Sequence, residues 1–535
     1  MLRWLSRIFN GQTDGITAAA LIVGASSLLS RVLGIVRDRV LAGTFGAGDA
    51  LDAYYAAFRL PDTVYNLVIL GAISAGFIPV FTEYLEKKGK SEAAKIAGQI
   101  LSTVGVILVA GSILVFIFAP WILPFIVPGF SSEKLSLTVE LTRIMTLSPV
   151  FLGLSAVIGG VMQSLKRYVG FALAPIMYNA GIIGGTLILG PSIGILGAAW
   201  GVVVGAFLHL IVQAAAFSDF SMMRLPVPTL KSEAVRKILS LMGPRTAALG
   251  VSQLSLVILL GIATTLPAGS VAVYNLANNL QSFPLGVFGI SFAIAAFPLL
   301  SQAASRSDDA AFRAALTGAA RKIAFFILPA TAAFILLRAQ IVRLVLGMGE
   351  FDWSDTIRTA DVVALLALSL IAQSIVPLLT RAFYARQNTW TPFWITAIGE
   401  SLTIVLALWF RTSFGLLGLA AAVSISITIQ CLLLVAALRK QFGSLGRGEF
   451  MYSVYRNGVA TIAFCVAGFP VREWLGTVFP LRTFWQVALQ FSAAFFAGMV
   501  AFCITAWLMK SPEWKELSEA IRQRLWKKAK LMEVI

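Results

Sequence analysis

The segment GILGAAWGVVVGA at residues 194–206 recurs as GLLGLAAAVSISI at residues 415–427, 221 positions later. Ala47-Gly48 recurs as Ala268-Gly269 at the same spacing, and the prolines of FIPVF and FPLL, Pro79 and Pro298, lie 219 apart. Three matches at nearly one spacing indicate an internal repeat. The period contains six apolar segments, an even number, so both copies have the same orientation. This predicts two six-helix lobes related by a pseudo-two-fold axis along the membrane normal.

The composition places this repeat in a membrane. Of the 535 residues, 58% are hydrophobic and 13% are charged, whereas soluble domains have about 25% charged residues. A helix needs about 20 apolar residues to span a bilayer. The sequence therefore predicts an all-α integral membrane protein with about fourteen transmembrane helices. They are expected at 16–43, 51–83, 95–119, 136–165, 169–190, 193–217, 238–264, 268–300, 322–337, 359–380, 391–410, 415–438, 457–471 and 485–509.

Three of these segments have features of their own. The segment at 51–83 contains Pro61, which is expected to kink it. The segment at 322–337 is short and is expected to start earlier. The segment at 457–471 is the weakest, because it is short and ends at Pro470.

The distribution of Lys and Arg predicts the orientation. With the N-terminus inside, most of the basic residues outside the spans fall on the cytoplasmic side, as the positive-inside rule requires. Both termini are then cytoplasmic. The predicted parts are an interfacial segment at 1–15, an N-lobe at 16–217, a cytoplasmic linker at 218–237, a C-lobe at 238–438, two further helices within 439–509 and a basic amphipathic tail at 510–535.

The second predicted helix carries a polar stripe. Its members, at spacings of 3, 4, 3 and 4, are Asp52, Tyr55, Arg59, Asp62 and Asn66. This spacing puts them on one helical face, and a charged face is too costly to expose to lipid. We therefore expect the stripe to line a cavity together with Arg31 and Arg37 of the first helix. The alternative is that Asp52, Arg59 and Asp62 pair only with each other and fix the packing.

The repeat-related helix has a neutral polar face. It carries Asn275, Asn278, Asn279 and Ser282, which either contact a substrate or hydrogen-bond to neighbouring helices. Glu400 lies alone in a later helix, where it could bind Na⁺ or a proton, or sit near an interface. The sequence has no Walker A, HExxH or nucleophile-elbow motif. It thus predicts a transporter rather than an enzyme, with no cofactor or metal and no nucleic-acid partner, driven by a Na⁺ or H⁺ gradient or by the membrane potential.

Several stretches resemble a known family. They are SRVLGIVRD at 30–38, FGAGDALDAYYAAFRLPD at 45–62, GAISAGFIPVFTEY at 71–84, FPLGVFGISFAIAAFPLLS at 283–301 and RAFYARQNTWTP at 381–392. These closely resemble the signature of the MurJ (MviN) family of the MOP exporter superfamily, whose members flip lipid II across the bacterial cytoplasmic membrane. The resemblance implies two six-helix lobes and two C-terminal helices that form a groove for the lipid tail.

The resemblance also implies site residues. Arg31, Arg37, Asp52 and Arg59 match charged positions of the family, and Asp62 stands where an asparagine is usual. The chain departs from the family pattern at five positions, where family members often have charges: Tyr65, Asn66, Leu70, Asn279 and Ser282.

The resemblance therefore implies a flippase that binds lipid II and membrane lipids in the inner membrane, near the enzymes of cell-wall synthesis. Two alternatives stay open. One is an exporter of another polyprenyl-linked glycan or amphiphile, and the other is a transport-inactive cell-wall scaffold.

Overall fold

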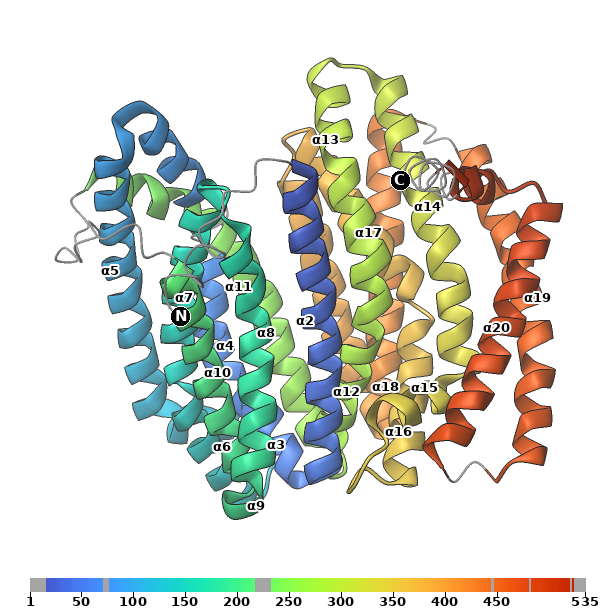
Figure 1. Ribbon diagram of the computed structural model, residues 1–535, viewed down its shortest axis with the longest axis horizontal. Coiled ribbons are helices and arrows are strands. Elements are labelled where there is room, and N and C mark those ends of the chain that lie inside the picture. Colours follow the sequence, from blue (N-terminus) through green and yellow to red (C-terminus); the bar gives the residue numbers. More distant parts are fainter. Residues whose placement is uncertain are drawn as a thin grey trace, which may run out of the picture. The chain divides into compact units, whose positions relative to one another are not determined.

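The chain is helical throughout the part that the computed structural model describes, which comprises residues 16–70, 77–216, 232–443, 447–480, 483–519 and 522–523 (Figure 1). The predicted interfacial segment at 1–15, most of the linker at 218–237 and the end of the tail lie outside the described residues. Contacts divide the chain into two compact units. The first unit comprises residues 1–275 with 346–355, and the second comprises residues 276–345 with 356–535.

The helices of the first unit are α2 (Ile16–Phe45), α3 (Asp49–Ala57), α4 (Arg59–Tyr65), the π-helix η1 (Asn66–Leu70), α5 (Ile78–Ile126), α6 (Ser132–Met145), α7 (Leu147–Ser164), α8 (Tyr168–Gly184), η3 (Gly185–Leu189), α9 (Gly190–Ile193), α10 (Ile195–Ala216) and α11 (Glu233–Thr264). α12 (Ser270–Pro284) begins in the first unit and ends in the second. The remaining helices are η4 (Leu285–Ile290), α13 (Ser291–Ser305), α14 (Asp309–Leu336), α15 (Arg338–Leu346), α16 (Trp353–Ala367), α17 (Leu370–Ala385), α18 (Trp390–Phe442), α19 (Arg447–Val478) and α20 (Phe484–Leu508).

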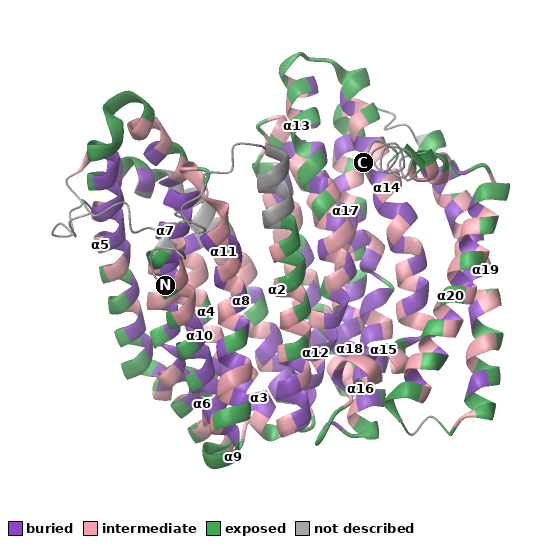
Figure 2. Cartoon of the chain, viewed as in Figure 1, coloured by how far each residue is buried: buried purple, intermediate pink, exposed green. Residues whose placement is uncertain are grey.

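The predicted fold class, an all-α membrane protein, is confirmed. Nine helical stretches of the described residues are long and apolar enough to cross a membrane, and a tenth arises if the bent pair α16 and α17 is one span. The count of fourteen stays a prediction. α18 alone contains two of the expected spans, because Gly415 interrupts it with non-helical backbone. Large apolar side chains are exposed along α5, among them Phe125 at 85%, as lipid-facing helices require (Figure 2).

The repeat reappears in the backbone. Gly194 and Gly415, the first residues of the matching segments, both have positive φ, at 61° and 55°, with ψ of −141° and −129°. Lys166 and Gln387, also 221 residues apart, share a φ of 58°. The π-helices η1 and η4 begin 219 residues apart, at Asn66 and Leu285. The two halves of the sequence therefore encode the same local breaks.

The individual helix predictions had different outcomes. The break at Pro61 is confirmed, because α3 ends at Ala57. In a continuous helix the ring of Pro61 would clash with the carbonyl of Ala57, four residues earlier. The earlier start of the ninth span is confirmed too, since α14 begins at Asp309. The span predicted at 457–471 is present but longer than expected, because α19 continues through Pro470 to Val478. One missing N–H does not end a helix that is packed along α20, as α19 is.

Close glycine contacts join α8 and η3 to α10 in the first unit. A Cβ on Gly181 would collide with the backbone of Gly205, and one on Gly185 would collide with the backbone of Gly201. Small residues four apart let helix backbones approach closely in membranes. This packing fixes α8, which carries a site residue described below.

Within the second unit, α19 and α20 attach to α14 at two points. Arg472 of α19 donates to the carbonyl of Leu336 at 2.8 Å, where α14 ends. Near the middle of α14, Arg321 Nε donates to Glu513 Oε1 at 2.6 Å, just after α20. Phe325, Phe464 and other apolar residues pack between these two points. The C-terminal helices α19 and α20 are therefore packed against α14.

The buried Glu513 carboxylate makes this attachment sensitive to pH. Burial alone would raise its pKa, but hydrogen bonds from Arg321, Ser511 and Ser453 outweigh it and lower the pKa below its usual 4.5. A carboxyl group with a lowered pKa stabilises the fold above its unfolded-state pKa and loses that contribution as the pH falls through the folded-state value.

We predict that Glu513→Gln lowers the thermal unfolding midpoint at pH 7, and that the difference from wild type narrows as the pH falls below about 4.5. Thermal unfolding of the purified chain from pH 7 to pH 3 measures this. A difference that stays constant over the range would contradict the stabilising role of the ionised carboxylate.

Candidate functional site

Four members of the polar stripe make no side-chain hydrogen bond or ion pair with the described residues. The Tyr55 hydroxyl and the Arg59 Nε are buried and lack a hydrogen-bond partner there. Asp62 is exposed and Asn66 is half-buried, and Asp62 interacts electrostatically with Arg59. The alternative that Asp52, Arg59 and Asp62 pair only with each other is wrong, because Asp52 pairs with Lys134. Buried polar groups usually find partners, so the two unpaired groups of Tyr55 and Arg59 indicate a surface that receives something else.

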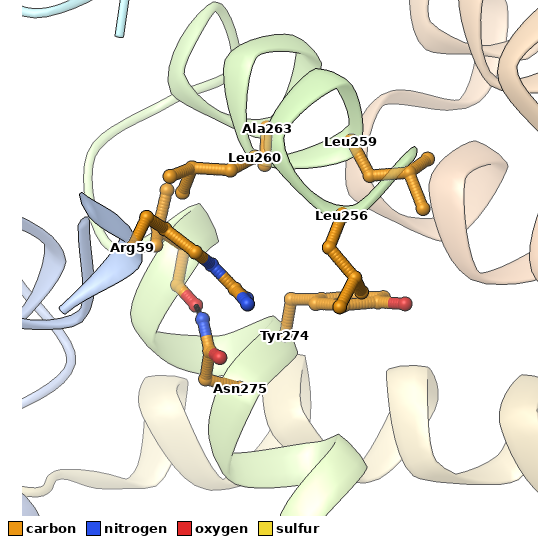
Figure 3. A pocket seen from close by; sticks show the side chains of 8 residues that line it. Arg59, Leu256, Leu259, Leu260, Ala263, Tyr274 and Asn275 are labelled. Atoms are coloured by element: carbon orange, nitrogen blue, oxygen red, sulfur yellow. Dashed lines mark hydrogen bonds between the residues drawn. The ribbon is translucent and has the colours of Figure 1, made fainter. Parts of the chain in front are cut away.

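Arg59 extends into a small pocket of the first unit. Figure 3 shows its guanidinium pointing between Leu256 of α11 and Tyr274 and Asn275 of α12. The other lining residues are leucine, valine and alanine. A cation among apolar walls keeps a strong field, because little water screens it. The position suits an anionic group that approaches along the stripe.

The two arginines of α2 differ in their surroundings. Arg37 donates to Asp38 Oδ1 at 2.8 Å and to Asn179 Oδ1 of α8 at 3.2 Å. It is therefore held in place within the first unit by Asp38 and Asn179. Arg31 is half-buried and makes no hydrogen bond or ion pair with the described residues. Arg31 and Arg59 are the cations available to a ligand, and Arg37 adds a fixed positive charge.

Asp52 has a different role from the one expected. Its carboxylate accepts the backbone N–H groups of Gly269 at 2.8 Å and Ala272 at 2.7 Å, and Lys134 Nζ at 2.7 Å. The two N–H groups belong to the N-terminus of α12, which has no intrahelical partners for them. Asp52 therefore caps α12 from another helix, and its oxygens are already occupied.

Three members of the neutral face, Asn278, Asn279 and Ser282, belong to the second unit. Ser282 is exposed and donates to the carbonyl of Asn279, while Asn279 is half-buried. Asn275, which belongs to the first unit, donates to the carbonyl of Val271. Glu400 is half-buried in α18. The described residues contain no cluster of three His, Cys, Asp or Glu side chains, so an ion-coupling role for Glu400 stays a prediction.

Sequence reasoning missed two residues that organise the site. Lys134 lies between the predicted spans at 95–119 and 136–165, and it follows Asp52 by 82 positions. Asn179, which holds Arg37, sits in an otherwise apolar stretch 142 positions away. An isolated asparagine in a spanning helix is itself a signal, because it needs a partner there. The identity of that partner depends on the tertiary fold.

Comparison with known proteins identifies the family of this chain. The family model described as Lipid II flippase MurJ matches residues 41–488, which is most of the chain. The chain belongs to the lipid II flippase MurJ family. Curated members include the lipid II flippase MurJ of Burkholderia cenocepacia, 29% identical over 432 residues that cover 79% of this chain and 84% of the relative. The probable lipid II flippase MurJ of Rhizobium meliloti is 28% identical over 490 residues, 90% of each chain.

Solved structures agree on the fold. A lipid II flippase MurJ in an inward closed conformation matches with a TM-score of 0.74 and 22% identity, covering 91% of this chain and 99% of that one. An inward-facing MATE family multidrug transporter of the MOP superfamily matches with a TM-score of 0.67 and 15% identity, covering 80% and 99%. The chain therefore shares the fold of these solved structures, and the recognition of the MurJ family from the sequence motifs is confirmed.

The cap on α12 is testable with a matched pair of aspartates. Lys134 contacts both Asp49 and Asp52, whose side chains are 68% and 2% exposed. We predict that Asp52→Ala lowers the free energy of unfolding by about 3 kcal/mol, because it removes the buried partner of Lys134 and leaves two N–H groups unpaired. Asp49→Ala should cost about 0–1 kcal/mol. Chemical or thermal unfolding measures both, and equal costs would contradict the cap.

Proposed function

We propose that this chain translocates lipid II across the bacterial cytoplasmic membrane by alternating access, with both termini in the cytoplasm. The curated relatives that carry the name lipid II flippase support the substrate. The observation that carries the proposal is the stripe itself: Arg59, Asp62 and Asn66 lie on one face without hydrogen bonds to the described residues. Ionisable residues inside a membrane mark substrate pathways when they are not paired.

In this mechanism, Arg31 and Arg59 bind the diphosphate of the lipid-linked precursor. Guanidinium groups offer paired, charged hydrogen bonds that match phosphate oxygens. Arg37 strengthens the positive field from its fixed position between Asp38 and Asn179. Asp62 balances the arginines when the site is empty, and the diphosphate displaces that weak interaction.

The remaining parts of the substrate meet other elements. The glycan contacts neutral groups such as Asn66, Asn279 and Ser282. The lipid tail runs outside along α19 and α20, whose exposed side chains include Val466 and Phe496, at 68% and 71%. A cation gradient acting through Glu400, or the membrane potential, drives the return. Enzymes of cell-wall synthesis supply the substrate on one side and consume it on the other.

A second candidate is an exporter of another polyprenyl-linked glycan. The neutral character of Asn279 and Ser282 favours it, because this face has no charge to select a particular head group. The diphosphate of such a glycan would bind Arg31 and Arg59 in the same way as the diphosphate of lipid II. A transport-inactive scaffold is the third candidate, and it requires no free cation at either position.

We predict that the chain restores growth of a bacterium depleted of its own lipid II flippase, and that Arg31→Ala and Arg59→Ala abolish this rescue without loss of protein from the membrane. Removing a charged contact to phosphate costs about 1.5–3 kcal/mol, or roughly ten- to hundredfold in binding. Arg306→Ala, at an exposed arginine after α13, is the matched control and should rescue fully. Rescue by both site variants would overturn the arginine site, and failure of the wild type would favour the scaffold.

A further inference from the structure

A chain of neutral hydrogen-bonding side chains runs through the second unit, outside the residues assigned so far. It begins where α16 ends at Ala367 and α17 begins at Leu370, a break with a 46° bend. At this break the N–H of Ser369 bonds to the carbonyl of Leu366. The carbonyl of Leu365 accepts a hydrogen bond from the hydroxyl of Ser424, at 2.7 Å.

The carbonyls at the break fix the direction of the first hydrogen bonds. A carbonyl oxygen accepts only, so the single hydroxyl proton of Ser424 is committed to Leu365. The Ser369 hydroxyl lies 3.1 Å from the Ser424 hydroxyl and 2.9 Å from the Leu366 carbonyl. Neither of these neighbours has a proton to give to Ser369, so the single Ser369 proton is used on one of the two. Ser369 must therefore accept from its remaining neighbour.

Two glutamines carry this polarity onward. Gln373 Nε2 donates to the Ser369 hydroxyl at 2.9 Å, which sets the orientation of its amide. The amides of Gln373 and Gln281 then form a reciprocal pair, with N···O distances of 3.4 and 3.5 Å. Gln281 is 2% exposed, and its Nε2 also donates to Asn278 Oδ1 at 3.2 Å. Each amide thus turns its N–H₂ group toward the next acceptor.

Asn278 is where the chain reaches the surface. Its side chain is exposed, and its carbonyl oxygen is occupied by Gln281. Its Nδ2 makes no hydrogen bond within the described part of the chain. Asn278 consequently presents two free N–H donors. It lies one residue before Asn279, on the neutral polar face of α12.

We propose that Asn278 donates a hydrogen bond to an acceptor oxygen of the substrate head group, and that Gln281 and Gln373 are the positioning residues that keep its N–H₂ group turned outward. This proposal rests on the proposed function, because it concerns the same lipid-linked substrate. Phosphate oxygens and the hydroxyl or amide oxygens of the glycan share the required chemistry. A neutral donor suits this face, since it binds such oxygens without bringing a further charge into the membrane.

The test measures initial translocation rates in proteoliposomes of the full chain, as a function of lipid II concentration. Asn278→Asp replaces the donor group by a carboxylate of nearly equal size on an exposed site. We expect its KM to rise about tenfold at pH 7.5, because the substrate loses one hydrogen bond to a charged or polar oxygen. The maximal rate should change less. Relative to wild type, the KM should recover as the pH falls to about 4 and below, because an exposed aspartate is protonated there and a protonated carboxyl group can donate again.

The positioning residues have a matched control. Ser424→Ala breaks the chain at its start, and Gln281→Leu breaks it next to Asn278; both should raise KM more than they lower the maximal rate. Ser426→Ala is the control, because Ser426 is 1% exposed, lies two residues away on α18 and has a hydroxyl without a partner among the described residues. It should keep the wild-type KM. Thermal unfolding of every variant separates loss of fold from loss of binding.

The outcomes separate this inference from the function on which it rests. Wild-type KM for Asn278→Asp at every pH, while the wild type transports lipid II, overturns the Asn278 contact alone. Failure of the wild type to move lipid II overturns the proposed function and this contact together. Competition by undecaprenyl diphosphate distinguishes the acceptor: weakened competition in Asn278→Asp assigns a phosphate oxygen, and unchanged competition with a raised KM assigns a glycan oxygen.

Discussion

The cost of placing a charge inside a bilayer is the constraint on which the rest of this structure depends. The described charges of the first unit meet it in two ways. Asp52 and Lys134 satisfy each other and cap α12, and Arg37 is held by Asp38 and Asn179. Arg31 and Arg59 have no such partners among the described residues. The paired charges keep helices in place, and the unpaired ones identify the surface that a charged ligand must complete. The same distinction separates the structural Asp52 from its neighbours on one helical stripe.

The internal repeat gives both halves the same breaks but different chemistry. Gly194 and Gly415 share a backbone conformation, and η1 and η4 follow equivalent helices. Before η1 the helix carries Arg59 and Asp62, whereas before η4 it carries only amides and hydroxyls. In the second half, polarity is organised by hydrogen-bond direction instead of charge, from the carbonyl of Leu365 through Gln373 and Gln281. A substrate with a diphosphate and a neutral glycan contains both kinds of acceptor, which is consistent with a division of labour between the halves.

Local patterns account for what could be predicted from the sequence. Apolar segment length predicted the helical class, and the 3, 4, 3, 4 spacing predicted the stripe. Pro61 predicted the break between α3 and α4, because its steric effect is local. Pro470 does not end its helix as predicted, since α19 packs along α20 and continues to Val478. The partners of Asp52 could not be predicted: Lys134 and Ala272 lie 82 and 220 positions away, and only the folded chain brings them together. The same holds for Gln281 and Gln373, which are 92 positions apart.

The family assignment and the unpaired arginines converge on one central claim, that the chain moves a diphosphate-linked glycan lipid and does not merely bind it. Purified chain reconstituted in proteoliposomes tests this directly, with lipid II and an undecaprenyl-linked O-antigen precursor compared under the same ion gradient and membrane potential. Accessibility of the head group to an added enzyme on the opposite side reports translocation. The account predicts that lipid II crosses and that the O-antigen precursor does not. Movement of the O-antigen precursor alone, or of neither lipid, would contradict it.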